Sequence, residues 1–432
     1  MKKIGVAIVG FGTVGAGVAE ILTKNHDLLV ARTGLDISLA KIADLDITTD
    51  RGVKVDPAIL CTDAFAAISD PSVDIVVELI GGIGIARKVI LAAIDAGKDV
   101  VTANKKLLAE CGAEIFGRAA DKGVDIYFGA SVGGGIPIIR VLREGLVGNA
   151  VRRINGILNG TCNYILTRME EEGLPFDDVL ADAQRLGYAE ANPSLDIDGF
   201  DTAHKALILA ALSYGVQIPL DSILVEGIRG LDGRDVRYAG ELGFKIKLLA
   251  TIAREDDGIK VFVAPTLVPK TNMLASVSGV FNAALVSCDM ADDTLYYGRG
   301  AGRFPTASTV VGDIADIAMN LAAGEVRHRN VIPKTGEASA LVPASEMRNA
   351  FYARLSVIDK PGSLGKFATI LGNHGVSIAA AMQKQGDDKP GAVPVVVITG
   401  KAREAGVKEA LAEILAAGVV AEPPVAYRIL KD

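Results

Sequence analysis

Residues 4–15 read Ile4-Gly-Val-Ala-Ile-Val-Gly10-Phe-Gly12-Thr-Val-Gly15, an apolar run that ends in three spaced glycines. The run predicts a strand over residues 4–9, and the stretch that follows predicts a helix over residues 13–23. Similar short apolar runs recur between helical stretches further along the chain, at residues 37–43, 73–79, 99–102 and 124–128. Strands that alternate with helices predict a parallel, doubly wound α/β sheet.

The three glycines have separate tasks in such a strand–turn–helix unit. Gly10 allows the tight turn, Gly12 lets a phosphate come close to the backbone, and Gly15 lets the helix pack closely on the strand. The free N–H groups at the start of the helix then attract the pyrophosphate of a dinucleotide. The sequence therefore predicts a Rossmann domain over residues 1–130 that binds NAD or NADP. The residues expected to contact this cofactor are Gly10, Gly12, Thr13, Val14 and Gly15.

The choice between the two dinucleotides depends on the end of the second predicted strand. Asp44 follows that strand and is able to accept a hydrogen bond from a ribose 2′-hydroxyl, which favours NAD. It lies later in the chain than the usual spacing, so the connection before the strand must be longer than normal. Lys41 and Arg51 are the nearest cations for the 2′-phosphate of NADP. Both cofactors stay open.

The rest of the chain divides into two further parts. Residues 131–302 predict an α+β catalytic and dimerisation domain, with helices expected at 176–186 and 200–214. A helix at 306–323 is expected to return to the Rossmann domain as part of residues 303–330. The final part, residues 350–432, has strands and helices in the order βαββαβ of a ferredoxin-like unit, and it carries no evident catalytic group. Its predicted elements are strands at 352–358, 377–385, 393–399 and 425–430 and helices at 363–372 and 402–416.

Composition excludes several classes of protein. The 432 residues have a formal net charge of −7 and no block of basic residues, so a nucleic-acid partner is not expected. No stretch is apolar for the roughly 18 residues that a membrane helix needs. The N-terminal apolar run is broken by glycines, unlike a signal peptide, so we expect a cytoplasmic protein. The four scattered cysteines are expected to be reduced and buried.

Two lysines stand in settings that suggest chemistry. Lys105, in Thr102-Ala-Asn-Lys105-Lys, directly follows a predicted strand, and ligands of doubly wound sheets bind beyond that end of the strands. Lys205 follows Asp201 by four residues, so both lie on one face of the predicted helix 200–214. Burial lowers the pKa of a lysine and a neighbouring acid raises it, which suits a group that exchanges a proton during hydride transfer. The alternatives are a solvated lysine that starts a helix and a solvated acidic loop. His204 is interpreted as a packing or surface residue.

The stretch Ala183-Gln-Arg-Leu-Gly187-Tyr-Ala-Glu190-Ala-Asn-Pro-Ser-Leu-Asp-Ile-Asp-Gly-Phe-Asp201-Thr-Ala-His-Lys205 resembles the signature of homoserine dehydrogenase along its whole length. Three shorter segments, at residues 78–82, 101–105 and 158–166, are also similar to that family. The resemblance covers residues 3–332. It implies reduction of L-aspartate 4-semialdehyde to L-homoserine with NADPH or NADH, in the biosynthesis of threonine, methionine and isoleucine.

The resemblance also implies roles for single residues. Lys205 is the expected proton donor and acceptor, and Lys105 is a second essential lysine near cofactor and substrate. Glu190 and Asp201 are expected to hold the substrate amino group. The main chain is expected to meet the cofactor at Gly187 and Gly302. A homodimer or homotetramer is expected.

Members of this family often bind a monovalent cation, such as Na⁺, through main-chain carbonyls. The matching carbonyls here are those of Gly129, Val132, Gly134 and Ile136. Gly129 stands where relatives commonly have Glu, and Ala43 stands where NADP-preferring relatives often have a basic residue. The alternative interpretation of this stretch is a glycine-rich crossover between domains.

Residues 350–432 resemble an ACT domain, with Asp359-Lys-Pro-Gly-Ser-Leu364 between the first strand and helix. The resemblance implies a small amino-acid effector and threonine feedback; the alternative is a dimerisation module without a ligand.

Other classes of dehydrogenase fit the sequence less well. A 2-hydroxy-acid dehydrogenase needs a His–acid pair, a thioester-forming dehydrogenase needs an activated cysteine, and neither setting is evident. A non-catalytic sensor would have no need of Lys105 and Lys205.

Overall fold

The computed structural model describes residues 1–324, 340–384 and 391–431, and the chain divides into two compact units. The first unit consists of Met1–Arg152, His204–Leu220 and Phe281–Ala338. The second consists of Arg153–Ala203, Asp221–Val280 and Ser339–Asp432. Residues 325–330 of the expected returning helix, and residue 385 of one expected strand, lie outside the described residues.

The first unit contains a six-stranded sheet in the order β3-β2-β1-β4-β5-β6. Every pair in it is parallel, which confirms the doubly wound prediction. The central strands β1 and β4 are buried on both faces because helices cover the sheet on each side. The strands are β1 Lys3–Val9, β2 Asp36–Ala43, β3 Leu60–Cys61, β4 Ile75–Glu78, β5 Asp99–Thr102 and β6 Ile126–Tyr127.

An additional helix explains the late position of Asp44. Helix α2, His26–Thr33, follows α1, Thr13–Lys24, and lengthens the connection to β2.

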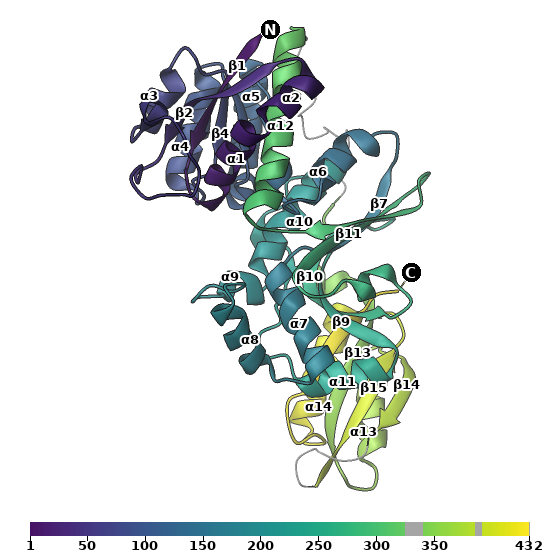
Figure 1. Ribbon diagram of the computed structural model, residues 1–432. Coiled ribbons are helices and arrows are strands. Elements are labelled where there is room, and N and C mark those ends of the chain that lie inside the picture. Colours follow the sequence, from purple (N-terminus) through teal and green to yellow (C-terminus); the bar gives the residue numbers. More distant parts are fainter. Residues whose placement is uncertain (325–339, 385–390, 432) are drawn as a thin grey trace. The chain divides into compact units, whose positions relative to one another are not determined.

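The apolar residues of α12, Arg303–Ala323, belong to the same core cluster as those of β1 and α1, so this helix returns to the sheet from far along the chain (Figure 1). Close packing of α1 on α12 requires Gly17, because a Cβ there would lie 3.0 Å from Ala307 Cβ.

The first unit contains further elements besides this sheet. They include the hairpin of β11 and β12, which pair antiparallel. The second half of α10 also belongs to this unit. The bounds are α3 Ala64–Ser69, α4 Gly84–Asp95, α5 Lys105–Lys122, α6 Ile138–Arg140, α10 Phe200–Tyr214, β11 Phe281–Cys288 and β12 Asp293–Arg299, with short 3₁₀ turns at Pro57–Ile59 and Gly129–Ser131 and a π-turn at Val141–Gly145.

The second unit is built on a mixed sheet whose strands follow the order β7-β9-β10-β17-β13-β15-β14. Strand β17 pairs parallel with β10 and antiparallel with β13, so the C-terminal strands continue the sheet of the middle of the chain. The strands are β7 Val151–Ile157, β9 Phe244–Glu255, β10 Gly258–Pro269, β13 Arg348–Ile358, β14 Ile378–Gln383, β15 Ala392–Thr399 and β17 Val425–Ile429, with β8 Leu224–Val225 beside β10 and β16 Ala402–Arg403 beside β13.

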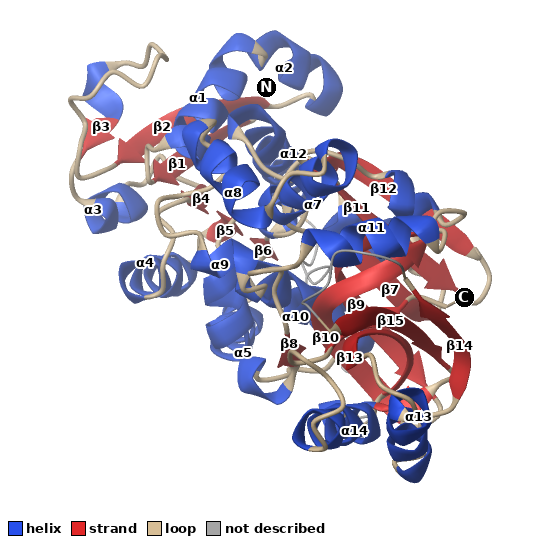
Figure 2. Cartoon of the chain, turned by 90° about the horizontal axis from the view of Figure 1, so that it is seen from below, coloured by secondary structure: helices blue, strands red, loops and turns tan. Residues whose placement is uncertain are grey.

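The C-terminal module, residues 348–429, has the predicted βαββαβ order, with the two-residue β16 as an addition. Its helices α13 and α14 lie side by side (Figure 2), and they share one apolar core with β13 and β15. The helices of this unit are α7 Gly160–Glu172, α8 Phe176–Arg185, α9 Ser194–Ile197, α11 Gly233–Glu241, α13 Ser363–Asn373 and α14 Glu404–Ala416.

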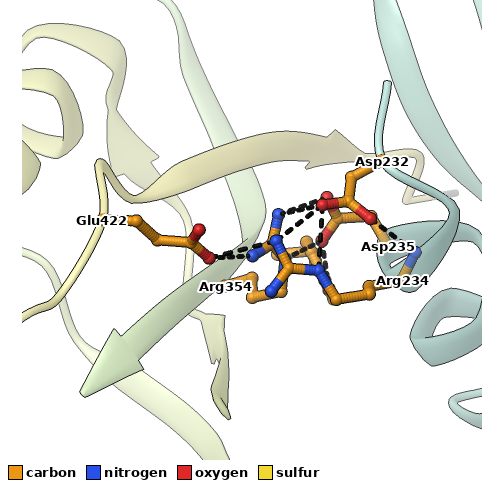
Figure 3. Close-up of polar contacts among 6 residues, drawn as sticks. Asp232, Arg234, Asp235, Arg354 and Glu422 are labelled. Atoms are coloured by element: carbon orange, nitrogen blue, oxygen red, sulfur yellow. Dashed lines mark hydrogen bonds and ion pairs between the residues drawn. The ribbon is translucent and has the colours of Figure 1, made fainter. Parts of the chain in front are cut away.

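A buried ionic cluster joins the C-terminal module to α11. The Arg354 guanidinium, 4% exposed, donates to Asp235 Oδ1 at 2.7 Å and to Glu422 Oε1 at 2.8 Å (Figure 3). Tyr352 Oη also donates to Asp235, at 2.8 Å. Removal of one partner would leave a buried charge without compensation, which costs far more than the loss of a surface ion pair. The module is therefore attached by buried polar contacts as well as by the shared sheet.

Two expectations about single features can be compared with the structure. No helix of the described residues is long and apolar enough to cross a membrane. All four cysteines are free thiols, but only Cys162 and Cys288 are buried. The expectation of burial was wrong for Cys61 and Cys111, which lie in a two-residue strand and on α5 and are partly exposed.

Candidate active site

The glycine turn after β1 lines a cavity of about 290 Å³ at the carboxyl ends of β1, β2 and β4. Gly10 has a φ of +103°, a conformation that favours glycine. A Cβ on Gly15 would lie 2.0 Å from the carbonyl oxygen of Gly10, so only glycine lets α1 approach the turn. A Cβ on Gly12 would meet nothing within 4 Å, because Gly12 faces the open cavity. The cavity therefore has the shape and backbone donors that a dinucleotide needs.

Asp44 lies on the wall of this cavity, at the end of β2. Its carboxylate accepts the N–H of Phe11 and, at 2.9 Å, the N–H of Asp46, so it fastens the glycine turn to the end of β2.

The two candidate cations for a 2′-phosphate are already paired with acids. Lys41 Nζ lies 3.3 Å from Asp70, and Arg51 lies 3.0 Å from Asp46. Both cations that the sequence offers for a 2′-phosphate are thus engaged by acids in this structure.

Lys105 is placed by a hydrogen-bond network at the ends of β4 and β5. Thr102 Oγ1 donates to Glu78 Oε2 at 2.7 Å and accepts the N–H of Asn104 at 3.0 Å. Asn104 caps α5 by accepting the N–H of Leu107 at 3.2 Å. Lys105 is the first residue of α5 and is half-buried. Its position beyond the carboxyl end of a parallel strand is the one that the sequence predicts.

A polar cluster in the second unit gathers two carboxylates around Asn159, the residue that caps α7. Asn159 Oδ1 accepts the N–H of Cys162 at 2.8 Å. Its Nδ2 donates to Asp196 Oδ1 at 2.7 Å and to Asp201 Oδ2 at 2.8 Å. Asn159 and Asp201 are both only 5% exposed. The helix cap therefore also holds two acidic side chains from α9 and α10, and neither Asn159 nor Asp196 was among the expected site residues.

The start of α7 also holds the loop that carries Glu190. Thr161 Oγ1 donates to the carbonyl of Tyr188 at 2.6 Å, and Gln184 Nε2 donates to the carbonyl of Glu190 at 3.1 Å. Gly187 turns the chain out of α8 with a φ of +75°. The Glu190 side chain is exposed. The loop is thus fixed through its main chain while the Glu190 carboxylate extends into solvent.

Helix α10 carries the other proposed groups. Asp201 and Lys205 are one helical turn apart, and Lys205 is only 8% exposed. A buried ammonium requires compensation by polar partners, so Lys205 does not belong to a solvated surface, which was the alternative interpretation of this stretch. His204 is 3% exposed, which agrees with a packing residue and not with a surface residue.

The loop expected to bind a cation is buried and rich in glycine. Gly134 has a φ of +53°, and its carbonyl accepts the hydroxyl of Thr309 at 2.7 Å. The carbonyl of Ile136 accepts the N–H of Ile138 at 2.8 Å. A carbonyl oxygen has two lone pairs, so these bonds leave room for a cation. Among the residues described, no three His, Cys, Asp or Glu side chains gather in a cluster that could hold a metal ion.

Asp313 lies against this loop. Its Oδ2 accepts the N–H of Gly129 at 2.8 Å, and burial raises the pKa of Asp313 to about 7. A Cβ on Gly129 would lie 2.9 Å from Asp313 Oδ1, so the glycine makes room for this carboxylate. Val132, a further expected carbonyl, is fully buried in the same loop.

The structure divides the expected residues between the units. The glycine turn, Thr13, Val14, Lys105, Lys205 and Gly302 belong to the first unit. Gly187, Glu190 and Asp201 belong to the second. Gly302 has a φ of +121° and precedes α12, which packs beside α1.

Residues 10–129 match the NAD-binding domain of homoserine dehydrogenase, and residues 137–315 match the homoserine dehydrogenase family. The homoserine dehydrogenase of Neisseria gonorrhoeae is 44% identical over 426 residues, which cover 98% of each chain. The chain belongs to the homoserine dehydrogenase family. It is an NAD(P)-dependent oxidoreductase.

Further relatives of this homoserine dehydrogenase family member agree along the whole chain. The homoserine dehydrogenase of Pseudomonas aeruginosa is 41% identical and covers 99% of each chain. The crystal structure of a homoserine dehydrogenase from Thiobacillus denitrificans superposes with a TM-score of 0.94 at 42% identity, and the match covers 100% of this chain and 99% of that one. Residues 351–416 match the ACT domain, which confirms the interpretation of the C-terminal module.

Proposed function

We propose that the chain catalyses the reversible, NAD(P)H-dependent reduction of L-aspartate 4-semialdehyde to L-homoserine, a step toward threonine, methionine and isoleucine. The observation that carries this proposal is the Asn159 cluster. It holds the Asp201 carboxylate in place one helical turn before the buried Lys205. A substrate with an ammonium group and a carbonyl needs a fixed acid for the first and a proton-bearing cation for the second.

Each of the proposed site residues has its own role in this reaction. Asp201 and Glu190 bind the substrate ammonium, Asp201 as a fixed carboxylate and Glu190 from a loop fixed only through its main chain. Lys205 gives a proton to the carbonyl oxygen during reduction and takes it back during oxidation. Lys105 holds the substrate near the carboxyl ends of the strands. The bound nicotinamide supplies or accepts the hydride.

Asn159 is a positioning residue in this scheme. Its single amide group bonds to both Asp196 and Asp201, so it sets their separation and keeps both ready to accept a cation. Two carboxylates close together would each resist ionisation, and the shared N–H donors offset that repulsion.

The cavity at the glycine turn fits either dinucleotide. The ion pairs of Lys41 and Arg51, together with Asp44 on the cavity wall, support efficient use of NAD. A monovalent cation such as Na⁺ would be held by the carbonyls of Gly129, Val132, Gly134 and Ile136, where its charge would stabilise the buried loop.

The ACT domain supports feedback by an amino acid, with threonine as the expected effector, in a homodimer or homotetramer. The Arg354–Asp235 contact links this domain to α11, and α11 packs against α7, whose cap residue is Asn159. A change in the ACT domain therefore has a short path within the second unit to the carboxylate cluster.

The test is a spectrophotometric assay of purified protein with L-homoserine, run with NAD and with NADP and with or without threonine. We expect reduction of nicotinamide that depends on L-homoserine, and lower rates with threonine. Small 2-hydroxy acids serve as the comparison substrates. Activity with those acids and none with L-homoserine would overturn the proposal, and binding of dinucleotide without any activity would favour the sensor.

A further inference from the structure

A basic cavity in the second unit lies outside the proposed active site. It has a volume of about 70 Å³, and strands β9 and β10 and the C-terminal module line it. Six cationic side chains stand on its wall: Arg153, Lys260, Arg348, Lys401, Arg428 and Lys431. Glu255 is the only acidic residue among the wall residues that the structure describes. This balance is opposite to that of the whole chain, whose net charge is −7.

Three of the six cations are neutralised by acids. The distances are 3.0 Å for Arg153–Glu255, 2.5 Å for Lys260–Glu255, 3.1 Å for Lys260–Asp257 and 2.6 Å for Arg428–Glu226. Arg428 also bonds to Glu404. Two of these cations are buried, with Lys260 8% exposed and Arg428 3% exposed. These ion pairs make the wall rigid without supplying a free donor.

The other three cations, Arg348, Lys401 and Lys431, are exposed and have no carboxylate within ion-pair distance among the described residues. Asn349, next to Arg348, has a buried Nδ2 for which the described structure offers no acceptor. A buried amide donor without a partner is uncommon in native proteins and indicates a missing group. Charge and orphan donor together point to an anion.

The wall distinguishes between kinds of anion. An amino acid would bring an ammonium that needs a free carboxylate, but Glu255 is already held by Arg153 and Lys260. A phosphoryl group carries no cation and has at least three acceptor oxygens. The fork of an arginine and the point charge of a lysine are both common partners for it. We propose that this cavity binds a small phosphate-bearing anion, at a site that shares no lining residue with the cofactor cavity.

The location gives the site a consequence. Its donors come from β13, from the β15–β16 connection and from the second residue after β17, while its floor includes Thr251 and Phe262 of β9 and β10. The bound anion would reduce repulsion between cations of the C-terminal module and so stabilise the junction of that module with the rest of the sheet. A ligand that binds only the folded state raises its stability in proportion to occupancy.

The experiment uses the full chain with the dinucleotide site saturated by NAD, which has no phosphomonoester group, so that phosphate bound at the glycine turn is not counted. Inorganic phosphate is titrated by calorimetry against potassium chloride of equal ionic strength. We expect saturable binding that is weaker by about tenfold in Arg348→Gln and in Lys401→Gln, since each loses a charge-assisted hydrogen bond. Lys366→Gln, which removes an exposed lysine of α13, is the matched control and should bind as the unmodified chain does.

A second titration with glycerol phosphate identifies the source of the phosphoryl group. Tighter binding than inorganic phosphate indicates a phosphomonoester metabolite, and weaker binding indicates the free ion. Heat that never saturates, or equal affinity in Arg348→Gln, Lys401→Gln and Lys366→Gln, would overturn the proposal. Both wall variants change exposed side chains, so circular dichroism should show an intact fold. Neither variant touches a residue of the proposed reaction.

Discussion

The cofactor region of the first unit and the carboxylate cluster of the second use different kinds of atoms. The glycine turn uses main-chain atoms; its shape depends on the absence of side chains at Gly10 and Gly15, and the space in front of it on their absence at Gly12. The cluster uses side chains, and one amide, that of Asn159, connects residues 37 and 42 positions away. The first region is therefore sensitive to added volume, whereas the second is sensitive to changed charge.

The largest effect is expected at the amine of α10. Lys205→Ala should lower kcat by about 10²–10⁴-fold, because the carbonyl oxygen loses its proton donor. Dinucleotide binding, followed by fluorescence quenching or calorimetry, should be unchanged. Lys366→Ala, on the exposed face of α13, is the control. An unchanged kcat would remove Lys205 from the mechanism.

Two glycine variants test whether volume alone breaks the cofactor region. Gly12→Ala should fold normally, since its methyl meets no protein atom, but should raise KM for the dinucleotide on the order of 10²-fold. Gly15→Ala places a methyl 2.0 Å from the Gly10 carbonyl, so it should also destabilise the fold, by about 1–3 kcal/mol. Urea denaturation and initial rates separate the two. Equal stability loss in both variants would contradict this account.

A charge variant tests the carboxylate cluster. Asn159→Asp removes both shared donors and adds a third carboxylate, so KM for L-homoserine should rise tenfold or more. The acid limb of the pH–rate profile should move to higher pH, because neighbouring carboxylates raise one another's pKa. Asn192→Asp makes the same charge change in the exposed loop before α9 and should leave both quantities unchanged. A lower stability with an unaltered profile would assign Asn159 only a structural role.

Within the cofactor region, the end of β2 contributes a side chain, that of Asp44. Asp44→Asn should shift the ratio of kcat/KM for NAD to that for NADP by about tenfold toward NADP, because the ribose hydroxyl loses a charged acceptor. Asn retains an oxygen for the N–H of Phe11. Loss of the same size with both cofactors would show that Asp44 only fastens the turn.

The smallest effect concerns stability and pH. Burial raises the pKa of Asp313 to about 7, above the value of about 3.9 in an unfolded chain. Between these values the folded state holds a proton that the unfolded state has lost, so the free energy of unfolding decreases as pH rises from about 4 to about 7. Asp313→Asn should flatten this slope in urea titrations at several pH values. A slope that stays the same would assign it to other groups.

The contrast between the regions also explains what the sequence could predict. The strands and helices of the first unit could be predicted from apolar periodicity. The glycine turn could be predicted because steric clashes exclude most side chains at Gly10 and Gly15. The βαββαβ order of the C-terminal module was predicted for the same reason. Strands β9 and β10 were not located, because both are long and largely buried, so their apolar residues do not alternate with polar ones, although Asp257-Gly258 between them is a hairpin turn signal.

Contacts between polar side chains that are far apart in the chain could not be predicted from the sequence. Nothing local connects Asn159 with Asp196, and Asn159 by itself reads as a helix cap. Lys247 makes the same point: it is 1% exposed, donates to the carbonyl of Val277 at 2.6 Å, and burial lowers its pKa to about 8. In the sequence it resembles any polar residue of an alternating strand. Lys205 could be singled out because it follows Asp201 by one helical turn and because its neighbourhood resembles a family signature.

The placement of β17 matters to anyone who would shorten this polypeptide to free it from regulation. In the sheet, β17 lies between β10 and β13. It follows both strands in the chain, so it leaves the ribosome last of the three during synthesis. A version cut before residue 425 would present two bare strand edges, each a template for pairing with other molecules. Deregulation by truncation would then come with aggregation, whereas point changes in the Asp359–Leu364 loop would leave the sheet whole.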